Sequence, residues 1–370
     1  MSRKGATGPD ESGKRATVKE VAARAGVSTA TVSRVMGGTY PVAEATRLRV
    51  QQAARELDYV LNASARGLRS TTSNTVAFVV ADVKGPFFSL IADGVEQQAT
   101  AEGRLCLVCT THNDPDRELA VIKLLREQRA EAIILVGGAV QTPEYTERMV
   151  KLAHSLDAEG SRLVLCGRPS LGPDVPETVV EYDNEGGAFA MTSHLLSMGH
   201  ERIALIGVGD HTTAAQRVRG YHRALEARGV PFAPELVLRG DHRREEGYQA
   251  TRELLRRKEQ FTALFAVTDI IAAGAMKALR EAGVRVPEDV SLVGYDDIPL
   301  SQDLTPELTT VHVPHEELGR TSVRLALNRE QNPVQHVTLG THVVVRQSAG
   351  AATSWHNDGG TGATGGRSPQ

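Results

Sequence analysis

The amino-acid pattern predicts an α/β protein in two parts, with a small all-helical domain at the N-terminus and a doubly wound body behind it. Between residues 17 and 61 the apolar residues recur at helical spacing only, whereas from residue 74 onward short apolar runs alternate with amphipathic stretches. The body holds about 275 residues, which is close to the size at which chains divide their hydrophobic core, and this length predicts two lobes.

The N-terminal domain begins with the pattern of two short helices around a tight turn. Thr17 and Glu20 have the spacing of a capping box. Apolar residues follow at helical spacing, at Val18, Val21, Ala22 and Ala25. Gly26 ends this helix, and Ser28 caps a second one over residues 29–35. Two helices about a glycine turn are typical of a helix-turn-helix, whose second helix enters the major groove of DNA.

A third helix and a linker complete this part of the chain. Pro41 opens a helix over residues 43–57, and a short Ala-rich helical segment precedes the polar linker at residues 70–74. The predicted division is a disordered extension (1–16), a helix-turn-helix domain (17–61), a hinge (62–73), the two-lobed body (74–349) and a disordered tail (350–370).

The charge distribution separates the two parts. Residues 1–70 contain 12 basic and 6 acidic residues, a net charge of +6, whereas the whole chain has a net charge of −3. A basic segment joined to an acidic body predicts a domain at the N-terminus that binds a polyanion such as a nucleic acid.

The body alternates predicted strands and helices along its whole length. Strands are expected at 76–80, 105–108, 132–136, 163–165, 203–206, 236–238, 263–267 and 291–293, and helices at 88–101, 116–129, 187–198, 218–228, 248–256 and 270–282. This order predicts parallel sheets with helices on both faces. Ligands of such folds bind at the carboxyl ends of the strands, here in the cleft between the lobes.

Several classes of protein are excluded by what the sequence lacks. No stretch approaches the roughly 20 apolar residues that span a bilayer, and the polar start lacks the apolar core of a secretory signal, so we expect a cytoplasmic protein without membrane contact. Cys106, Cys109 and Cys166 lie in apolar runs and are predicted to be buried, reduced strand residues. The histidines lack metal-ligand spacing, so no metal site is predicted.

Enzyme motifs are also missing. Gly207 and Gly209 could begin a dinucleotide-binding loop, but Thr212 stands where the third glycine belongs. There is no phosphate-binding loop and no motif for a catalytic nucleophile. The sequence therefore predicts a binding protein rather than an enzyme, and no cofactor.

The N-terminal motif resembles that of the lactose repressor/galactose repressor family of bacterial transcription regulators. The resemblance rests on VKEVAARAGVSTATVSR at residues 18–34 and NASARGL at residues 62–68. It continues through the body at residues 85–88, 183–184, 199–203, 217–221, 294–297 and 345–348. It implies lobes like those of periplasmic sugar-binding proteins, joined by three crossovers. The DNA-side lobe would comprise residues 74–174 and 308–333, and the other lobe residues 175–307 and the last strand.

The resemblance also implies roles on DNA for individual residues. The base-reading positions would be Thr29, Ala30 and Arg34, and the phosphate-contacting positions Ser28, Thr31 and Ser33. Hinge residues Asn62 and Leu68 would lie at the operator centre, where Leu68 enters a minor-groove step. Ala43 departs from the Ser or Thr that caps the third helix in many members.

A third set of residues would bind a small effector between the lobes. By the same resemblance this set is Asp82, Phe87, Arg168, Arg217, His242, Thr268, Asp269 and Asp296. Two departures bear on the ligand: Thr268 replaces an asparagine, and Gly167 replaces an aspartate that precedes the arginine in many sugar binders. A plain galactoside is therefore disfavoured, and Arg168 leaves room for a phosphorylated or acidic sugar.

The predicted function is a homodimeric, sequence-specific transcription regulator that binds a near-palindromic operator in double-stranded DNA. A small sugar-like effector is expected to control it, acting either as inducer or as corepressor, and the regulator is either a repressor or an activator. The alternatives are an effector-independent regulator and an exported solute-binding protein. The basic N-terminal domain and the absence of a signal peptide argue against the latter.

Overall fold

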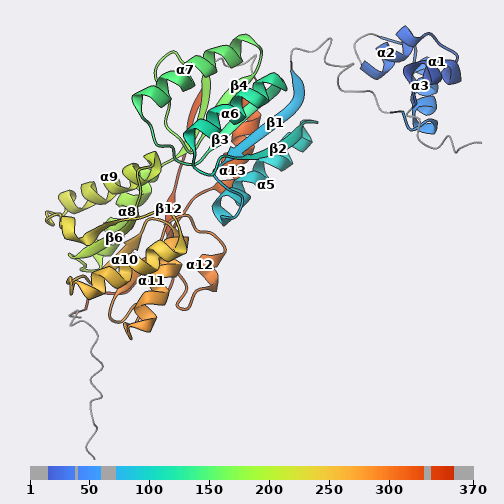
Figure 1. The fold of residues 1–370 in the computed structure, drawn as a ribbon. Helices are drawn as coiled ribbons and strands as arrows, with labels where there is room; N and C mark the ends of the chain where they lie inside the picture. The colour runs from blue at the N-terminus through green and yellow to red at the C-terminus, as the bar shows by residue number, and fades with distance from the viewer. Residues whose placement is uncertain (1–15, 38–40, 60–71, 329–334, 354–370) are drawn as a thin grey trace, which may run out of the picture. The chain divides into compact units, whose positions relative to one another are not determined.

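The computed structural model describes residues 16–37, 41–59, 72–328 and 335–353 (Figure 1). The predictions for the extension at 1–15, for Asn62 and Leu68 in the hinge, and for the tail at 354–370 lie outside these residues. The chain divides into two compact units, with the boundary between Ser73 and Asn74, and each is described by itself.

The first unit is the predicted three-helix domain, with α1 at Val18–Ala25, α2 at Thr29–Gly37 and α3 at Glu44–Glu56. Its core is small, since Val21, Val32 and Val50 are its fully buried residues and alanines fill the space around them. An ion pair of 2.6 Å between Arg24 on α1 and Glu56 on α3 joins two of the helices.

The second unit contains two lobes, of which the first is built on a six-stranded parallel sheet with strand order β11-β5-β4-β3-β1-β2. The strands are β1 (Ser73–Val80), β2 (Leu105–Thr110), β3 (Ala130–Val136), β4 (Arg162–Cys166), β5 (Glu177–Tyr182) and β11 (Gln335–Leu339). Helices α5 (Pro86–Ala101) and α13 (His315–Leu327) cover one face, and α6 (Pro115–Glu127) and α7 (Pro143–Ala158) cover the other. The predicted α/β class is confirmed here.

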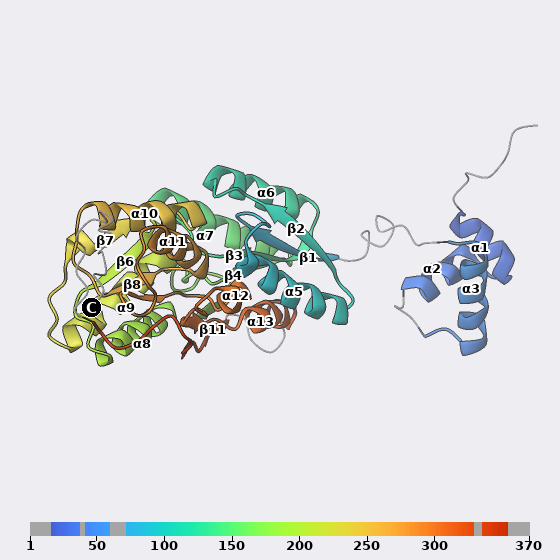
Figure 2. The ribbon, with the colours of Figure 1, turned by 90° about the horizontal axis from the view of Figure 1, so that it is seen from below.

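The second lobe is built on a four-stranded parallel sheet with strand order β7-β6-β8-β9. Its strands are β6 (Ile203–Val208), β7 (Val237–Arg239), β8 (Ala263–Ala266) and β9 (Ser291–Val293). The paired helices α8 (Asn184–Ser197) and α9 (Thr212–Ala227) lie on one side, and α10 (Arg244–Arg256) and α11 (Asp269–Glu281) lie on the other (Figure 2). The short elements η1 (Pro234–Leu236) and α12 (Leu300–Asp303) complete this lobe.

Three crossovers join the lobes, as expected, but two of the predicted boundaries are wrong. The first crossing follows β5, near Asp183 rather than Asp174, because β5 pairs with β4 in the first lobe. The second follows β10 (Thr310–His312), and the third lies between β11 and β12 (His342–Val344). β11 pairs with β5, so the first lobe extends beyond Pro333, and β10 pairs antiparallel with β12.

The cysteine prediction is only partly right. All three thiols are free, and Cys166 is buried in β4, but Cys106 and Cys109 are partly exposed. The reason is that β2 lies at the edge of the sheet and, among the strands that the structure describes, pairs only with β1. No helix in the described part of the chain is long and apolar enough to cross a membrane.

The ordered body extends slightly further than predicted. Residues 350–353, assigned to the tail, pack on the second lobe through main-chain contacts. The Gly350 carbonyl lies 2.9 Å from Nε2 of the buried His200, and the Ala352 N–H donates to the Met198 carbonyl over 2.9 Å.

Candidate DNA-reading face and effector cleft

The local structure of the first unit presents α2 as a reading helix. The Thr17 N–H donates to the Glu20 carboxylate over 2.6 Å, and the Glu20 N–H lies 3.4 Å from the Thr17 hydroxyl, which completes the predicted capping box. Gly26 adopts a left-handed conformation (φ 65°) that makes the turn between the helices. The Ser28 hydroxyl accepts from the Thr31 N–H over 3.2 Å and caps α2.

The predicted DNA-contacting residues share the outer face of α2. Val32 is fully buried against the other helices, so the opposite side of α2 faces solvent. Ala30 and Arg34 are exposed on that side. Thr29 is exposed in the first turn of the helix, and Ser33, which is partly exposed, lies one turn beyond it. The hydroxyls of Ser28 and Thr31 lie 2.9 Å apart and share one hydrogen bond. Ala43 makes no side-chain cap at α3, as its lack of a hydroxyl predicts.

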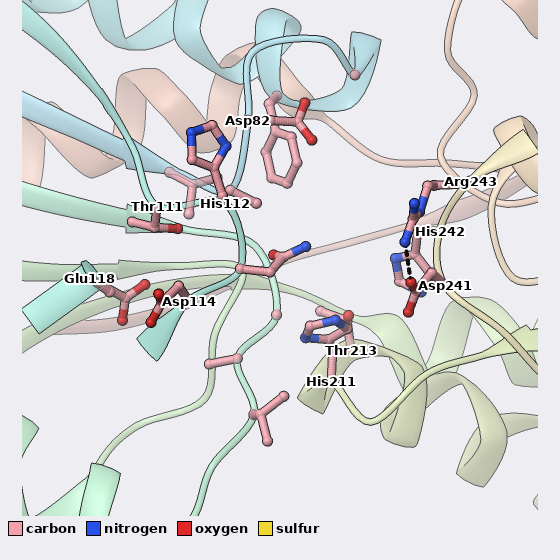
Figure 3. A pocket seen from close by; sticks show the side chains of 18 of the residues that line it. Asp82, Thr111, His112, Asp114, Glu118, His211, Thr213, Asp241, His242 and Arg243 are labelled. Carbon is pink, nitrogen blue, oxygen red and sulfur yellow. Dashed lines mark hydrogen bonds and ion pairs between the residues drawn. The ribbon is translucent and has the colours of Figure 1, made fainter. Parts of the chain in front are cut away.

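In the second unit, a cavity of about 630 Å³ lies between the two lobes (Figure 3). The first lobe contributes the segments that follow β1, β2, β3 and β4, and the second lobe those that follow β6, β7 and β8. All of these are carboxyl ends of parallel strands, where ligands of this fold class bind. Among the polar residues that line it are Asp82, Thr111, His112, Asn113, Asp114, Glu118, Arg168, His211, Thr213, Asp241, His242, Arg243 and Arg244.

The eight predicted effector residues divide into two groups. Asp82, Arg168 and His242 line the cavity. The other five, which are Phe87, Arg217, Thr268, Asp269 and Asp296, are not part of its lining. Phe87 packs instead against Phe88 and His315, with ring centroids 5.4 and 5.0 Å away, and Phe88 is the ring that lines the cavity.

Arg168 lines the cavity but directs its donors into the protein. Its two terminal nitrogens lie 3.0 and 2.8 Å from the two Glu118 oxygens, and its Nε donates to the Gly137 carbonyl over 2.7 Å. Nη1 also lies 3.2 Å from the Tyr145 hydroxyl, which donates to Glu118. Burial is the largest single influence on the pKa of Glu118 and raises it, but the charge of Arg168 and the hydrogen bonds from Arg168 and Tyr145 together lower it, so the carboxylate stays ionised.

Arg217 and Asp296 form a second buried ion pair, and neither residue belongs to the cavity lining. Their closest atoms are 3.1 Å apart, and the Arg217 guanidinium lies 3.7 Å above the Tyr295 ring. Arg217 also bonds to Asn184 over 2.9 Å and to the hydroxyl of Tyr182, the last residue of β5, over 3.1 Å. Arg217 therefore links the second lobe to the strand from which the chain leaves the first.

Thr268 and Asp269 have structural partners. The Thr268 hydroxyl caps α11 by accepting from the Ile271 N–H over 3.3 Å. Asp269 is fully buried, accepts from the Ile298 N–H over 3.0 Å, and lies 2.5 Å from the Thr310 hydroxyl. Burial raises the pKa of Asp269 well above its ordinary value, and the neighbouring Asp296 adds to this effect.

Several lining residues were absent from the sequence prediction. His112 and Asn113 follow β2 with φ angles of 56° and 60°, in the left-handed region that non-glycine residues rarely adopt. Such conformations cluster at ligand-binding segments. Thr213 lies near the start of α9, which follows β6, so an earlier helix start would have indicated it. Glu118 already lay in the first turn of the helix predicted over residues 116–129, but nothing local in the sequence distinguished it from the other acidic residue of that turn.

The geometry defines a class: a helix-turn-helix domain with an exposed reading face, joined to a two-lobed, ligand-binding body. Residues 17–62 match the family described as bacterial regulatory proteins, lacI family, and residues 192–349 match the periplasmic binding protein-like domain. The chain belongs to the lacI family and is a DNA-binding transcription regulator.

Curated relatives and solved structures agree with this assignment. The HTH-type transcriptional repressor PurR of Aliivibrio fischeri (strain MJ11) is 36% identical over 318 residues, which cover 85% of this chain and 91% of the relative. PurR of Haemophilus influenzae (strain PittEE) is 35% identical over 315 residues, covering 85% and 91%. A transcriptional regulator CelR–cellobiose complex has a TM-score of 0.66 at 34% identity, covering 90% of this chain and 100% of that one. The lac repressor dimer bound to operator and the anti-inducer ONPF has a TM-score of 0.77 at 27% identity, covering 91% and 100%.

Proposed function

We propose that the chain is a homodimeric repressor whose affinity for a near-palindromic operator changes when a small polyhydroxylated effector occupies the cavity between the lobes. The observation that carries this proposal is the presence, in one chain, of an exposed reading helix and a polar interlobe cavity of about 630 Å³. We assign it no chemical reaction, because its relatives are named as repressors and binding accounts for its parts. It would act in the cytoplasm, where the DNA lies.

On DNA, Thr29, Ala30 and Arg34 would read base edges, with Arg34 presenting its fork to guanine O6 and N7. Ser28, Thr31 and Ser33 would contact phosphates, which set register rather than sequence. The role proposed for Asn62 and Leu68 is to bind the minor groove at the operator centre.

In the cleft, Asp82 and His242 would face the effector directly. Arg168 would hold Glu118 ionised at the cavity wall, where the carboxylate can accept a ligand hydroxyl. Arg217 and Asp296, supported by Phe87, Thr268 and Asp269 around them, would connect the ligand to the interlobe strands, because Arg217 already bonds to Tyr182. A cellobiose complex of CelR and a ribose complex of an Enterococcus faecium regulator support a sugar-like ligand.

The dimer contact is proposed on the free edge of the first lobe. Among the described strands β2 pairs only with β1, yet Leu105 and Val108 on it are 63% and 52% exposed, and Leu124 on α6, the next helix along the chain, is 60% exposed. An unpaired edge with exposed apolar side chains favours association with another chain. A second copy is the occupant that a near-palindromic operator requires, and the lac repressor neighbour is a dimer.

The test is selection of bound DNA from a random pool by the full chain, followed by fluorescence anisotropy at fixed salt. We expect two related half-sites. Arg34→Ala should lose roughly 1–3 kcal/mol of discrimination at one base pair of each half-site. Arg49→Ala, which removes an equal charge from the exposed surface of α3, is the matched control and should keep the wild-type preference at every position. Enrichment of no sequence would refute the proposal, and an unchanged preference in Arg34→Ala would remove Arg34 from base reading.

A further inference from the structure

We propose that the effector carries an acidic group, a carboxylate or a phosphate, which binds at the N-terminus of α9 against His211 and Thr213. This inference rests on the proposed role of the cavity as the effector site and names the chemical class of its ligand. Figure 3 shows both side chains at the start of this helix, on the second-lobe side of the cavity.

The start of α9 has unused hydrogen-bond donors. The helix spans 16 residues, and its N-cap residue His211 makes no side-chain cap. The Thr212 N–H donates to the Ala139 carbonyl over 3.1 Å, and the Ala215 N–H donates to the His211 carbonyl over 3.1 Å. The intervening N–H groups, of Thr213 and Ala214, bond to no residue in the described ranges. Free N–H groups and the helix dipole together attract an anion.

Two side chains at this helix end independently indicate a missing ligand. Thr213 is only 5% exposed, yet it lines the cavity, and its hydroxyl has no hydrogen-bond partner among the described residues. His211 also lines the cavity, and its Nδ1 is buried without a partner in the same part of the chain. A buried and unpaired nitrogen such as Nδ1 of His211 is costly, and the Thr213 hydroxyl belongs to a residue of the cavity lining, so both groups suit a ligand that accepts hydrogen bonds.

The charges on the two walls of the cavity indicate how the ligand is oriented between the lobes. On the second lobe the described lining carries two cations, Arg243 and Arg244, together with His242, whose pKa is lowered by burial to about 3, so that its ring is neutral at pH 7. One carboxylate, Asp241, belongs to this described lining and lies 2.6 Å from Arg243. The first-lobe wall carries three carboxylates, which are Asp82, Asp114 and Glu118, together with Lys84, Arg168 and His112.

Arg168, the cation on which an acidic ligand was first expected to bind, is already committed to Glu118, Tyr145 and Gly137. An anion would therefore be repelled by the first-lobe carboxylates and attracted to the second-lobe wall. The hydroxyls of the same ligand would face the carboxylates, which accept hydrogen bonds. A sugar acid or a sugar phosphate combines these two features.

The experiment is calorimetry on the full chain with matched ligands: glucose, glucuronate and glucose 6-phosphate, and the corresponding galactose series. Acetate and inorganic phosphate are the smallest probes and are compared by thermal shift. We expect an acidic ligand to bind roughly 2- to 30-fold more tightly than its neutral partner, in line with the effect of an anion at a helix N-terminus. Comparison of glucuronate with glucose 6-phosphate shows whether the acidic group of the ligand is a carboxylate or a phosphate.

Variants of Thr213 locate the binding site. Thr213→Val should remove most of the preference for the acid, and Thr213→Ser, which keeps the hydroxyl, should retain it. Thr192→Val is the matched control, because Thr192 is also buried with an unpartnered hydroxyl but lies on α8 and does not line the cavity. It should bind like the wild type.

The outcomes separate this inference from the proposed function. A neutral sugar that binds as tightly as its acids and changes operator affinity overturns the inference and leaves the proposed function standing. An acid that binds through Thr213 without changing operator affinity supports the inference and contradicts the proposed function. If no sugar binds, stabilisation by phosphate or acetate that Thr213→Val abolishes supports the acidic site. No such stabilisation, or one that Thr213→Val leaves unchanged, overturns it.

Discussion

The buried ion pair between Arg168 and Glu118 permits a direct test of how the cavity wall is held together. Both side chains are less than a tenth exposed, and Arg168 directs its Nε and both terminal nitrogens to Gly137, Tyr145 and Glu118. Arg168→Met would leave the Glu118 carboxylate buried without its cation. Breaking a buried pair in this way costs about 3–5 kcal/mol of unfolding free energy. At roughly 2–4 °C per kcal/mol, the melting temperature should fall by about 6–20 °C.

Two further variants identify the cause of that loss. Arg168→Met combined with Glu118→Gln removes both charges and should recover most of the stability. Arg162→Met is the matched control, since Arg162 is also buried but lies 3.7 Å from Asp157, whose side chain is 43% exposed and retains its contact with water. Its loss of stability should be smaller than that of Arg168→Met, because the carboxylate that it leaves behind stays hydrated.

The measurement is thermal unfolding followed by circular dichroism at pH 7. The pKa of Glu118 is lowered on folding, so the pair stabilises the protein above the ordinary pKa of glutamate, and this contribution is lost as the pH falls below it. An Arg168→Met variant that melts like the wild type but has lost its effector affinity would refute this reasoning. Arg168 would then be a ligand donor, as its position in the sequence first indicated.

Three further predictions concern DNA bending, the effector and pH. Leu68→Ala should reduce operator bending in a circular-permutation gel assay while keeping salt-sensitive, non-specific binding; equal bending by mutant and wild type would argue against a wedge. Arg217→Ala and Asp296→Ala should each weaken effector binding in calorimetry, and unchanged affinity in both would remove the pair from the proposed site. Burial raises the pKa of Asp296 to about 6, only partly offset by Arg217. Its contribution to stability is therefore complete below about pH 4 and lost as the pH rises through about 6. A plot of melting temperature against pH should show this loss in the wild type and not in Asp296→Asn; parallel curves would contradict it.

The three-helix domain was predictable from the sequence because its signals are local. The capping box at Thr17 and the left-handed turn at Gly26 act within a few residues of the chain, and both occur as expected. Strand β5 was missed, although it determines where the chain leaves the first lobe. Its glutamates, Glu177 and Glu181, interrupt the apolar run that identifies a buried strand, so only the pairing with β4 reveals it.

The ligand-facing residues of the cleft were less predictable. Ion pairs and hydrogen bonds between residues far apart in the sequence decide which polar side chains stay free to bind a ligand. Arg168 and Glu118 are 50 positions apart, and no pattern along the chain shows that they meet. The start of α9 was expected at Val218, which left Thr213 in a loop; the helix begins at Thr212 and brings that hydroxyl into the cavity wall. The fold class and the general place of the cleft follow from periodicity, whereas the ligand-facing residues require the packing of the lobes.

The central claim is that a ligand in the interlobe cavity controls binding to DNA. Its most direct test is the dissociation constant for the selected operator, measured by fluorescence anisotropy at fixed salt with and without the ligand that binds the protein most tightly in calorimetry. The account predicts a change of about 5- to 150-fold, which corresponds to a coupling of roughly 1–3 kcal/mol. An operator affinity that stays the same at saturating ligand would contradict it.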